Sequence, residues 1–249
     1  YRAASIIEGP LLIIAGAGSG KTRTVTYRIA NMLESGIPQS AILALTFTNK
    51  AAKEMADRVR EITGRRLSNL TVSTFHAFGV RVLRYSIHKL GYKPNFSIYD
   101  QTDKISLLKE VAREMNISQD SVDFYGLNNL FSAVKTGRTQ WTGETESLEP
   151  MYREYLDHLY VYNAVDFDDL IMLPIKIFEE HPEVLAEYRS RYRYLMVDEF
   201  QDTSLAQYRL MKLLGEESRN VCVVGDDDQS IYSWRGANYR NIINFEQDF

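Results

Sequence analysis

The feature that most constrains this chain is a glycine-rich stretch near its start, residues 15–22, with the sequence AGAGSGKT. An apolar run at residues 11–14 precedes it and is typical of a buried parallel strand. Apolar residues at helical spacing follow it: Val25, Ile29, Met32 and Leu33. This order of strand, glycine-rich loop, lysine, hydroxyl and helix indicates a phosphate-binding loop, although Ala15 stands where the usual pattern has its first glycine.

Each part of this loop suits a bound polyphosphate. Glycines let successive backbone N–H groups point at phosphate oxygens, and the N-terminus of the following helix adds partial positive charge. Lys21 would place a cation on the β- and γ-phosphates, and the Thr22 hydroxyl is positioned to hold Mg²⁺. The alternative is a glycine-rich turn between a strand and a helix that binds no ligand.

Hydropathy and cysteine content exclude several settings for this chain of 249 residues. No apolar run approaches the roughly 20 residues of a membrane span, and no signal-peptide pattern opens the sequence. The single cysteine, Cys222, lies in an apolar run and is expected in the core. Such sparse use of cysteine favours a reducing, cytoplasmic setting, with no membrane partner.

The formal net charge of −4, taken alone, argues against a nucleic-acid partner, but the charges are unevenly spread. Lysine and arginine outnumber aspartate and glutamate in residues 1–90, and the remainder of the chain carries the acidic excess. A polyanion could therefore bind one part of the surface. This distribution permits a nucleic-acid partner without demonstrating one.

Alternation of apolar strands with helices predicts a doubly wound α/β fold. Strands are expected at residues 11–14, 42–46, 70–74, 194–197 and 221–224, and helices at 50–62, 76–90 and 204–214. The early strands each run into a polar or aromatic loop and then into a helix, which is the pattern of a parallel sheet flanked by helices. Ligands of such sheets gather at the carboxyl ends of the strands.

The pattern changes from about residue 91, where strand signals give way to helical segments. Helices are expected near residues 102–115, 125–135, 150–162 and 166–179. We interpret this stretch as an all-helical subdomain inserted into the α/β domain. The predicted division is a first part of the α/β domain at residues 1–84, the insertion at 85–178 and the second part at 179–249.

A carboxylate pair, Asp198 and Glu199, follows the apolar strand at residues 194–197. Beside a phosphate loop, a carboxylate at a strand end is where a nucleotide-bound Mg²⁺ needs a second protein ligand, and Asp198 suits that task. Glu199 could then orient and deprotonate the attacking water. The alternative is a solvated acidic start of a helix.

The loop after the strand at residues 221–224 contains a further polar and aromatic set. Gln229 could hydrogen-bond a γ-phosphate or its water without adding charge. Tyr232, Trp234 and Arg235 offer aromatic faces and a planar cation on which bases could stack. Core packing is the alternative for Trp234.

Two other strand ends are followed by loops that could touch a nucleic acid. Phe47 lies between two threonines, ahead of the amide of Asn49. Thr74 and His76 open a helix whose backbone N–H groups could take a phosphate. Each loop alone is a weak signal, and a helix cap or a surface position is the alternative for His76.

Six segments, in this order, resemble the N-terminal half of superfamily 1A DNA helicases, the Rep/UvrD/PcrA group. They are AGAGSGKTR, LTFTNKAAKEM, STFHAFG, DFDDL, VDEFQDT and VGDDDQSIYSWRGA. The resemblance covers residues 9–249 and implies a RecA-like P-loop domain whose helical insertion corresponds to the family's domain 1B. It further implies ATP and Mg²⁺ as cofactors, movement from 3′ to 5′, and single-stranded DNA and single-strand/duplex junctions as partners.

The resemblance also implies roles for individual residues. Glu199, Gln229 and Lys21 would be catalytic, and Thr22 and Asp198 would hold the metal. The implied ATP contacts are Gly16, Ala17, Gly18, Ser19, Gly20, Lys21, Thr22 and Arg23. The implied DNA contacts are Phe47, Asn49, Thr74, His76, Tyr232, Trp234 and Arg235.

Two parts of the family pattern lie outside this sequence. The family's adenine-reading glutamine would precede Tyr1, and its second motor domain, with the arginine fingers, would follow Phe249. We therefore interpret the chain as the N-terminal half of a helicase, which alone would hydrolyse ATP poorly. The alternatives are a helicase–nuclease subunit of the same superfamily, a P-loop ATPase of another class, or a nucleic-acid-binding module with a relic nucleotide site.

Overall fold

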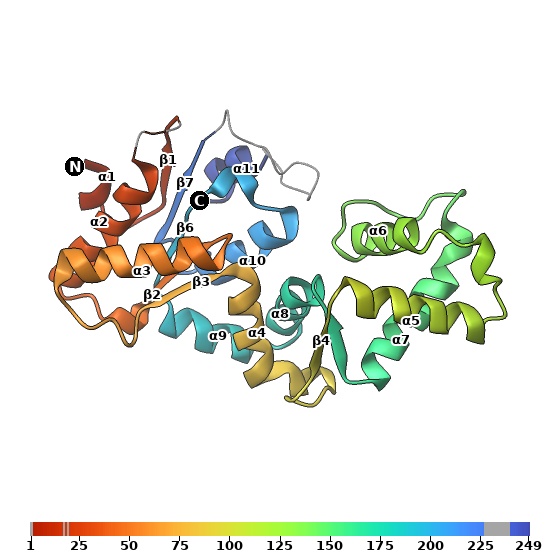
Figure 1. The fold of residues 1–249 in the computed structure, drawn as a ribbon. Coiled ribbons are helices and arrows are strands. Elements are labelled where there is room, and N and C mark those ends of the chain that lie inside the picture. Colours follow the sequence, from red (N-terminus) through yellow and green to blue (C-terminus); the bar gives the residue numbers. More distant parts are fainter. Residues whose placement is uncertain (1, 17, 19, 227–239) are drawn as a thin grey trace. The chain divides into compact units, whose positions relative to one another are not determined.

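The chain divides into two compact units in the computed structural model, which describes residues 2–16, 18, 20–226 and 240–249 (Figure 1). The first unit comprises Tyr1–Phe78 and Phe178–Phe249, and the second comprises Gly79–Ile177. The chain passes between them inside two helices, α4 (Phe75–Ser86) and α8 (Asp169–Glu180). We predicted the boundary between the units at residue 85, whereas in the structure it lies between Phe78 and Gly79. Because α4 continues through this point, no break in the sequence pattern marks the boundary.

A parallel sheet forms the centre of the first unit, as predicted. Within the described residues its strand order is β1-β7-β6-β2-β3, and every neighbouring pair is parallel. The strands are β1 (Leu11–Ile14), β2 (Ile42–Thr46), β3 (Thr71–Thr74), β6 (Tyr194–Val197) and β7 (Val221–Gly225). The last strand in the chain, β7, thus lies between β1 and β6, so its carboxyl end is flanked by the ends of both (Figure 1).

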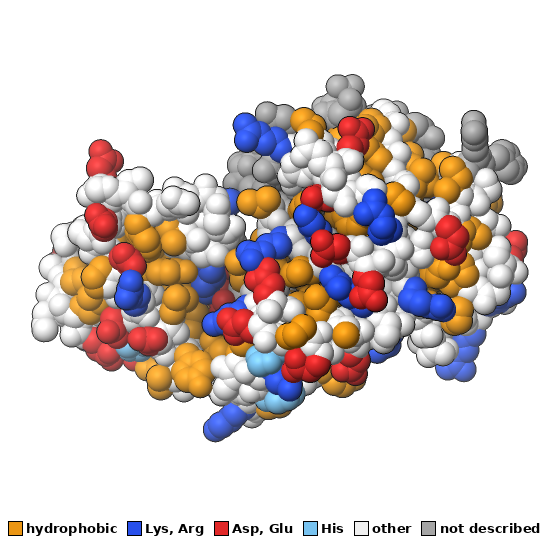
Figure 2. All heavy atoms as spheres, turned by 180° about the vertical axis from the view of Figure 1, so that it is seen from behind, with side chains coloured by type: hydrophobic (Ala, Val, Ile, Leu, Met, Phe, Trp, Pro, Cys, Tyr) orange, Lys and Arg blue, Asp and Glu red, His pale blue; other side chains and the backbone are white. Residues whose placement is uncertain are grey.

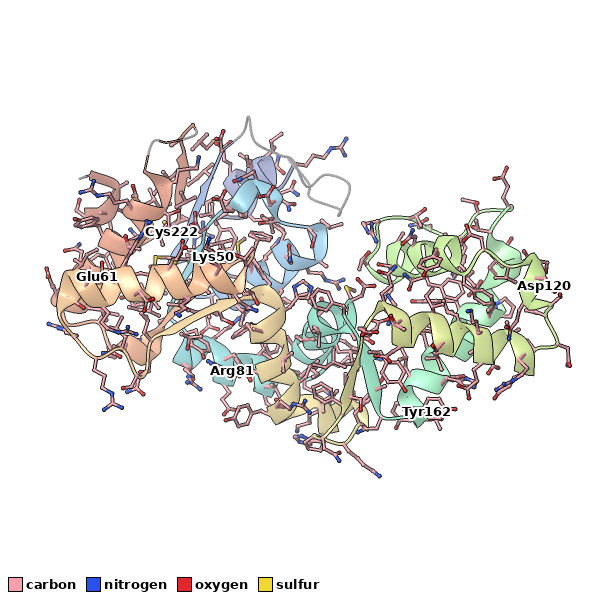
Figure 3. The ribbon with its side chains drawn as sticks, viewed as in Figure 1. Lys50, Glu61, Arg81, Asp120, Tyr162 and Cys222 are labelled. Carbon is pink, nitrogen blue, oxygen red and sulfur yellow. The ribbon has the colours of Figure 1, made fainter. Side chains whose placement is uncertain are left out.

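Helices cover both faces of this sheet, which confirms the predicted α/β class. On one face, α2 (Lys21–Glu34) and α3 (Asn49–Thr63) bury apolar side chains against alternate residues of the strands. The Cys222 side chain of β7 belongs to this core, as predicted (Figure 3). On the other face, α10 (Leu205–Gly215) packs on β6, with Gly215 beside Leu195.

The described residues of the first unit contain further helices. They are α1 (Arg2–Ser5), α9 (Pro182–Arg191) and α11 (Arg240–Asp248). The sequence analysis did not predict α9, because it buries only Val184 and Leu185 and therefore shows little apolar periodicity. Among the described residues, no helix is both long enough and apolar enough to cross a membrane.

The second unit is mainly helical. Its helices α5 (Gln101–Glu114), α6 (Phe124–Lys135) and α7 (Glu149–Val161) surround an apolar core that includes Leu108, Phe131 and Tyr155. The expectation of an all-helical insertion needs a correction, because β4 (Ser97–Tyr99) and β5 (Ala164–Asp166) pair as a two-stranded parallel sheet. Strands of three residues are too short to show an alternating pattern in the sequence.

Basic side chains are not segregated on the face shown in Figure 2. Lysine and arginine side chains lie there among acidic ones, and apolar side chains separate them. The basic excess of residues 1–90 therefore does not form one continuous patch on this face.

Candidate nucleotide-binding site

The glycine-rich loop connects β1 to α2 at the carboxyl edge of the sheet. The N–H of Ala15 donates to the carbonyl of Gly225 over 3.1 Å, which ties the start of the loop to the end of β7. Gly20 is the N-cap of α2 at φ 83°, in the left-handed region that glycine adopts at little cost. Among the described residues no side chain caps this end of α2, so its partial positive charge faces the loop.

The Lys21 ammonium is folded back over the loop. Its Nζ donates to the carbonyls of Ala15 and Gly16 over 2.8 and 3.2 Å, and to Asp226 Oδ2 over 3.2 Å. Both charged side chains are nearly buried, with 9% of Lys21 and 1% of Asp226 exposed. A cation held mainly by neutral carbonyls can exchange them for phosphate oxygens, which are stronger partners.

The predicted metal ligands lie next to each other. The Thr22 hydroxyl donates to Asp198 Oδ2 over 3.1 Å, across the gap between α2 and the end of β6. Adjacent oxygen ligands of an octahedral Mg²⁺ with bonds of 2.0–2.1 Å lie about 2.9 Å apart, so this pair fits such an ion. Burial and the neighbouring Glu199 raise the pKa of Asp198, and Thr22 and Lys21 oppose that rise.

Glu199 is held in an unusual backbone conformation at the end of β6. Its φ of 52° and ψ of 43° lie in the left-handed region, which residues other than glycine enter rarely. The N–H of Glu199 donates to Asp198 Oδ1 over 2.9 Å, and Glu199 Oε2 accepts the Gln201 amide over 2.7 Å. The carboxylate is therefore held by a hydrogen bond beside the metal ligands.

Two residues of the site were missed by the sequence analysis, Gln201 and Asp226. Gln201 Oε1 accepts the backbone N–H of Asp226 over 3.0 Å, and Asp226 is the carboxylate that pairs with Lys21. Their roles depend on β7 lying between β1 and β6, which no local pattern reveals. The one signal in the sequence that could have indicated Asp226 as a site residue is its position directly after the apolar strand β7.

Asp202 is a further carboxyl close to Glu199. Burial and the Glu199 charge raise the pKa of Asp202 to about 6. Within the described part of the chain, the buried Asp202 Oδ1 has no hydrogen-bond partner. Asp202 therefore adds a third carboxyl group beside Asp198 and Glu199.

The loops after β2 and β3 lie at the same edge, because Thr46 and Thr74 are register partners. The Phe47 ring is half-buried, with its centroid 5.6 Å from that of Phe75. Asn49 is exposed at the start of α3, next to Lys50, which Figure 3 labels.

Thr74 and His76, two of the predicted DNA contacts, lie at the start of α4. The Thr74 hydroxyl accepts the N–H of Ala77 over 3.1 Å and so caps α4. Burial lowers the pKa of His76 to about 4, so its imidazole is neutral near pH 7. Neither side chain offers a positive charge to a phosphate, and their roles toward a nucleic acid stay predictions.

The other predicted residues are placed as follows. Arg23 is exposed, and its guanidinium lies 5.4 Å from the Tyr27 ring centroid, one turn along α2. Ala17, Ser19, Gln229, Tyr232, Trp234 and Arg235 lie outside the described residues. The structure therefore brings together Lys21, Thr22, Asp198 and Glu199 at one edge of the sheet.

The parallel sheet, the loop before α2 and the Thr22–Asp198 pair define the class of this domain, an α/β domain with a phosphate-binding loop. The sequence matches the family of the UvrD/REP helicase N-terminal domain over residues 1–249, and the chain belongs to this family.

Relatives of this chain have been described in staphylococci. The chain is 46% identical over 251 residues to the ATP-dependent DNA helicase PcrA of Staphylococcus aureus. It has the same identity to the PcrA of Staphylococcus epidermidis. Each alignment covers 97% of this chain and 34% of the relative, so the chain spans about a third of the length of these relatives.

Proposed function

We propose that this chain is the ATP-binding motor domain of a DNA helicase that moves 3′ to 5′ along single-stranded DNA. The observation that supports it most is the convergence of Lys21, the Thr22–Asp198 pair and Glu199 at one sheet edge. The names of the relatives, ATP-dependent DNA helicases, favour ATP and DNA as the substrates.

Lys21 and the loop would bind the polyphosphate of ATP. The Lys21 ammonium would leave the carbonyls of Ala15 and Gly16 and donate to oxygens of the β- and γ-phosphates. Thr22 and Asp198 would hold Mg²⁺, which when bound neutralises charge on the same phosphates. The uncapped start of α2 would add the partial charge of its N–H groups.

Glu199 would act on the water that cleaves ATP. As the water oxygen forms a bond to the γ-phosphorus, the bond from that phosphorus to the bridging oxygen of ADP breaks. The Glu199 carboxylate accepts the proton that the water releases, and the products are ADP and inorganic phosphate. Gln229 would hydrogen-bond the γ-phosphate in the same step.

The loops at the ends of β2 and β3 would form part of the DNA track, together with residues after β7. We propose that Phe47 and Asn49 contact single-stranded DNA from the first loop and that Thr74 and His76 lie beside it. Tyr232, Trp234 and Arg235 would contribute the remaining stacking surfaces.

We further propose that the unit Gly79–Ile177 corresponds to the inserted domain of the family. In this proposal the unit meets duplex DNA ahead of the motor, so the substrate is a junction between single and double strands. A cytoplasmic location, which the cysteine content favours, belongs to the same proposal.

The test uses the full-length protein in two assays. Steady-state ATP hydrolysis should be low without DNA and should rise when single-stranded DNA is added. Strand separation should occur on a duplex with a 3′ single-stranded tail and not on the matched duplex with a 5′ tail. A rate of ATP hydrolysis that does not change when DNA is added would contradict the helicase proposal. Strand separation on the duplex with the 5′ tail would contradict the proposed polarity.

A further inference from the structure

Five hydrogen bonds link six residues at the sheet edge of the first unit. In order along these bonds they are Lys21, Asp226, Gln201, Glu199, Asp198 and Thr22, and Thr22 adjoins Lys21 in the chain. The function proposed above uses four of the six directly at nucleotide, metal or water. Gln201 is the side chain that joins Glu199 to Asp226, the partner of Lys21.

Gln201 is engaged at both ends of its amide. Nε2 donates to Glu199 Oε2 over 2.7 Å, and Oε1 accepts the Asp226 N–H over 3.0 Å. An amide serves both partners, whereas an ionised carboxylate cannot donate to Glu199 and an ammonium cannot accept from Asp226. The side chain is 3% exposed, so water does not substitute for either bond.

The surroundings leave this amide little room. A Cβ placed on Gly225 would lie 3.0 Å from Gln201 Oε1 and 3.4 Å from Phe200 Cβ. Phe200 is itself fully buried, with its ring centroid 5.9 Å from that of Phe245. Since the end of β7 touches the turn that contains Gln201, a shift of one requires a shift of the other.

We propose that Gln201 is a positioning residue for ATP hydrolysis, which orients the Glu199 carboxylate and links that orientation to Asp226, the partner of Lys21. The proposal rests on the function proposed above, because it requires Glu199 to act on a water. When Lys21 turns from Asp226 to a phosphate, the ion pair between them is lost, and the backbone N–H of Asp226 passes the change to the Gln201 amide. Glu199 is then adjusted only when nucleotide occupies the loop.

The test is Gln201→Glu in the full-length protein, with Gln207→Glu as the matched control. The new side chain keeps the size of glutamine and can still accept from Asp226. As a carboxylate it cannot donate to Glu199, and a proton shared between the two carboxyl groups would leave Glu199 a poorer acceptor for the proton of the water. We expect kcat for ATP hydrolysis to fall about 10- to 100-fold, the effect typical of losing a group that orients a reacting side chain. The Kd for ATP should stay within about threefold, because Lys21 and Thr22 are untouched.

Gln207 is a suitable control because it is a buried glutamine of the same unit with a different task. Its Oε1 accepts the N–H of Ser204 over 2.9 Å in the capping box of α10, and a glutamate accepts there equally well. Gln207→Glu should therefore keep the kcat and Kd of the unaltered protein. An equal loss of kcat in both variants would mean that buried charge alone is responsible, which would overturn the proposal.

A double variant separates positioning from packing. If Gln201 acts through Glu199, adding Gln201→Glu to Glu199→Gln should lower kcat no further, because the group that it orients is already gone. Independent, multiplicative losses would overturn the proposal. Unaltered hydrolysis in Glu199→Gln alone would contradict the proposed function instead, so the two failures are distinguishable.

A second variant keeps the proposal testable if Gln201→Glu does not fold. Gln201→Met removes both hydrogen bonds without burying a charge, and it should show the same loss of kcat with ATP affinity retained. A folded Gln201→Met protein with an unaltered kcat would overturn the proposal.

Discussion

Lys21 in the first unit and Lys135 in the second both meet buried carboxylates, but their surroundings differ. The Lys135 ammonium donates to Asp166 Oδ2 over 2.7 Å and to Asp169 Oδ1 over 2.9 Å. Lys21 has one carboxylate, Asp226, at 3.2 Å, and two neutral carbonyls complete its contacts. One lysine is fixed between two anions, and the other is held by partners that a phosphate can replace.

The cluster around Lys135 is satisfied from every side. The Tyr155 hydroxyl donates to Asp166 Oδ2 over 2.8 Å, and Asp166 and Asp169 accept each other's backbone N–H groups. Burial alone would lower the pKa of Lys135, but the two aspartates outweigh it and raise that pKa. Since Lys135 lies in α6, Asp166 in β5 and Asp169 in α8, these hydrogen bonds hold the three elements together. The comparison teaches that a lysine held between two buried anions marks structure, whereas a lysine held mainly by neutral carbonyls marks a binding site.

The largest expected effect separates these two lysines. Lys135→Met leaves two buried aspartates without their cation and should lower the free energy of unfolding of the second unit by about 3–5 kcal/mol. Lys21→Met should lower the free energy of unfolding of the first unit by less than this, because it affects one buried carboxylate, Asp226, where Lys135→Met affects two. Urea unfolding of each variant, compared with that of the unaltered protein, gives the two changes in the free energy of unfolding. Equal losses of stability would remove the distinction.

The second effect concerns His76, whose pKa burial lowers to about 4. The unfolded chain takes up its proton near pH 6.5, and the folded chain does so only near pH 4. The contribution of His76 is therefore fully present above pH 6.5 and is lost as the pH falls, by up to about 3 kcal/mol. This contribution is measured by comparing the free energy of unfolding of the unaltered protein with that of His76→Gln at several pH values between 7 and 4. An identical pH slope in both proteins would contradict the burial of this imidazole.

The third effect concerns the proposed DNA track. Phe47→Ala should weaken binding of single-stranded DNA by about 1–3 kcal/mol, the range for one stacked base. The affinity for ATP should be unchanged, because Phe47 follows β2, whereas the glycine-rich loop follows β1, and β7 and β6 lie between these strands. Fluorescence anisotropy with a labelled oligonucleotide gives the affinity. A loss of stability with unchanged DNA affinity would show that the ring only fills the core.

The smallest effect is expected at His158 in the second unit. Burial lowers its pKa, but the Glu154 carbonyl and Glu114, whose Oε2 lies 2.9 Å from Nε2, outweigh burial and raise it. The stabilising contribution is therefore present below about pH 6.5 and is lost as the pH rises through the raised value. Because Glu114 is exposed, His158→Gln should cost less than about 1 kcal/mol at pH 6. A larger loss at pH 8 than at pH 6 would contradict this sign.

Local patterns predicted most of the sheet and the chemistry of its edge. The apolar runs that became β1, β2 and β6 have the bounds expected from the sequence, and a helix follows the glycine-rich stretch as predicted. The contact between Thr22 and Asp198 followed from one general rule, that parallel strands end at the same edge.

The features that escaped prediction depend on contacts between distant residues. Gln201 and Asp226 meet because β7 lies between β1 and β6 in the sheet. No single segment of the sequence predicts this order of strands. The short pair β4–β5 joins residues more than sixty positions apart, with too few residues for a periodic signal. The Asp166–Lys135 pair likewise needed the fold to bring α6 to β5.

The most direct test of the site compares Lys21→Met with Glu199→Gln in the full-length protein. Calorimetric titration with Mg²⁺ and a slowly hydrolysed ATP analogue gives the affinity, and single-turnover hydrolysis of ATP gives the rate. Lys21→Met should weaken binding about 10- to 100-fold, since it removes a charged hydrogen-bond donor. Glu199→Gln should bind within about threefold of the unaltered protein and hydrolyse about 10²- to 10⁴-fold more slowly. Equal loss of binding in both variants would contradict the separate roles of the loop lysine and the strand-end glutamate.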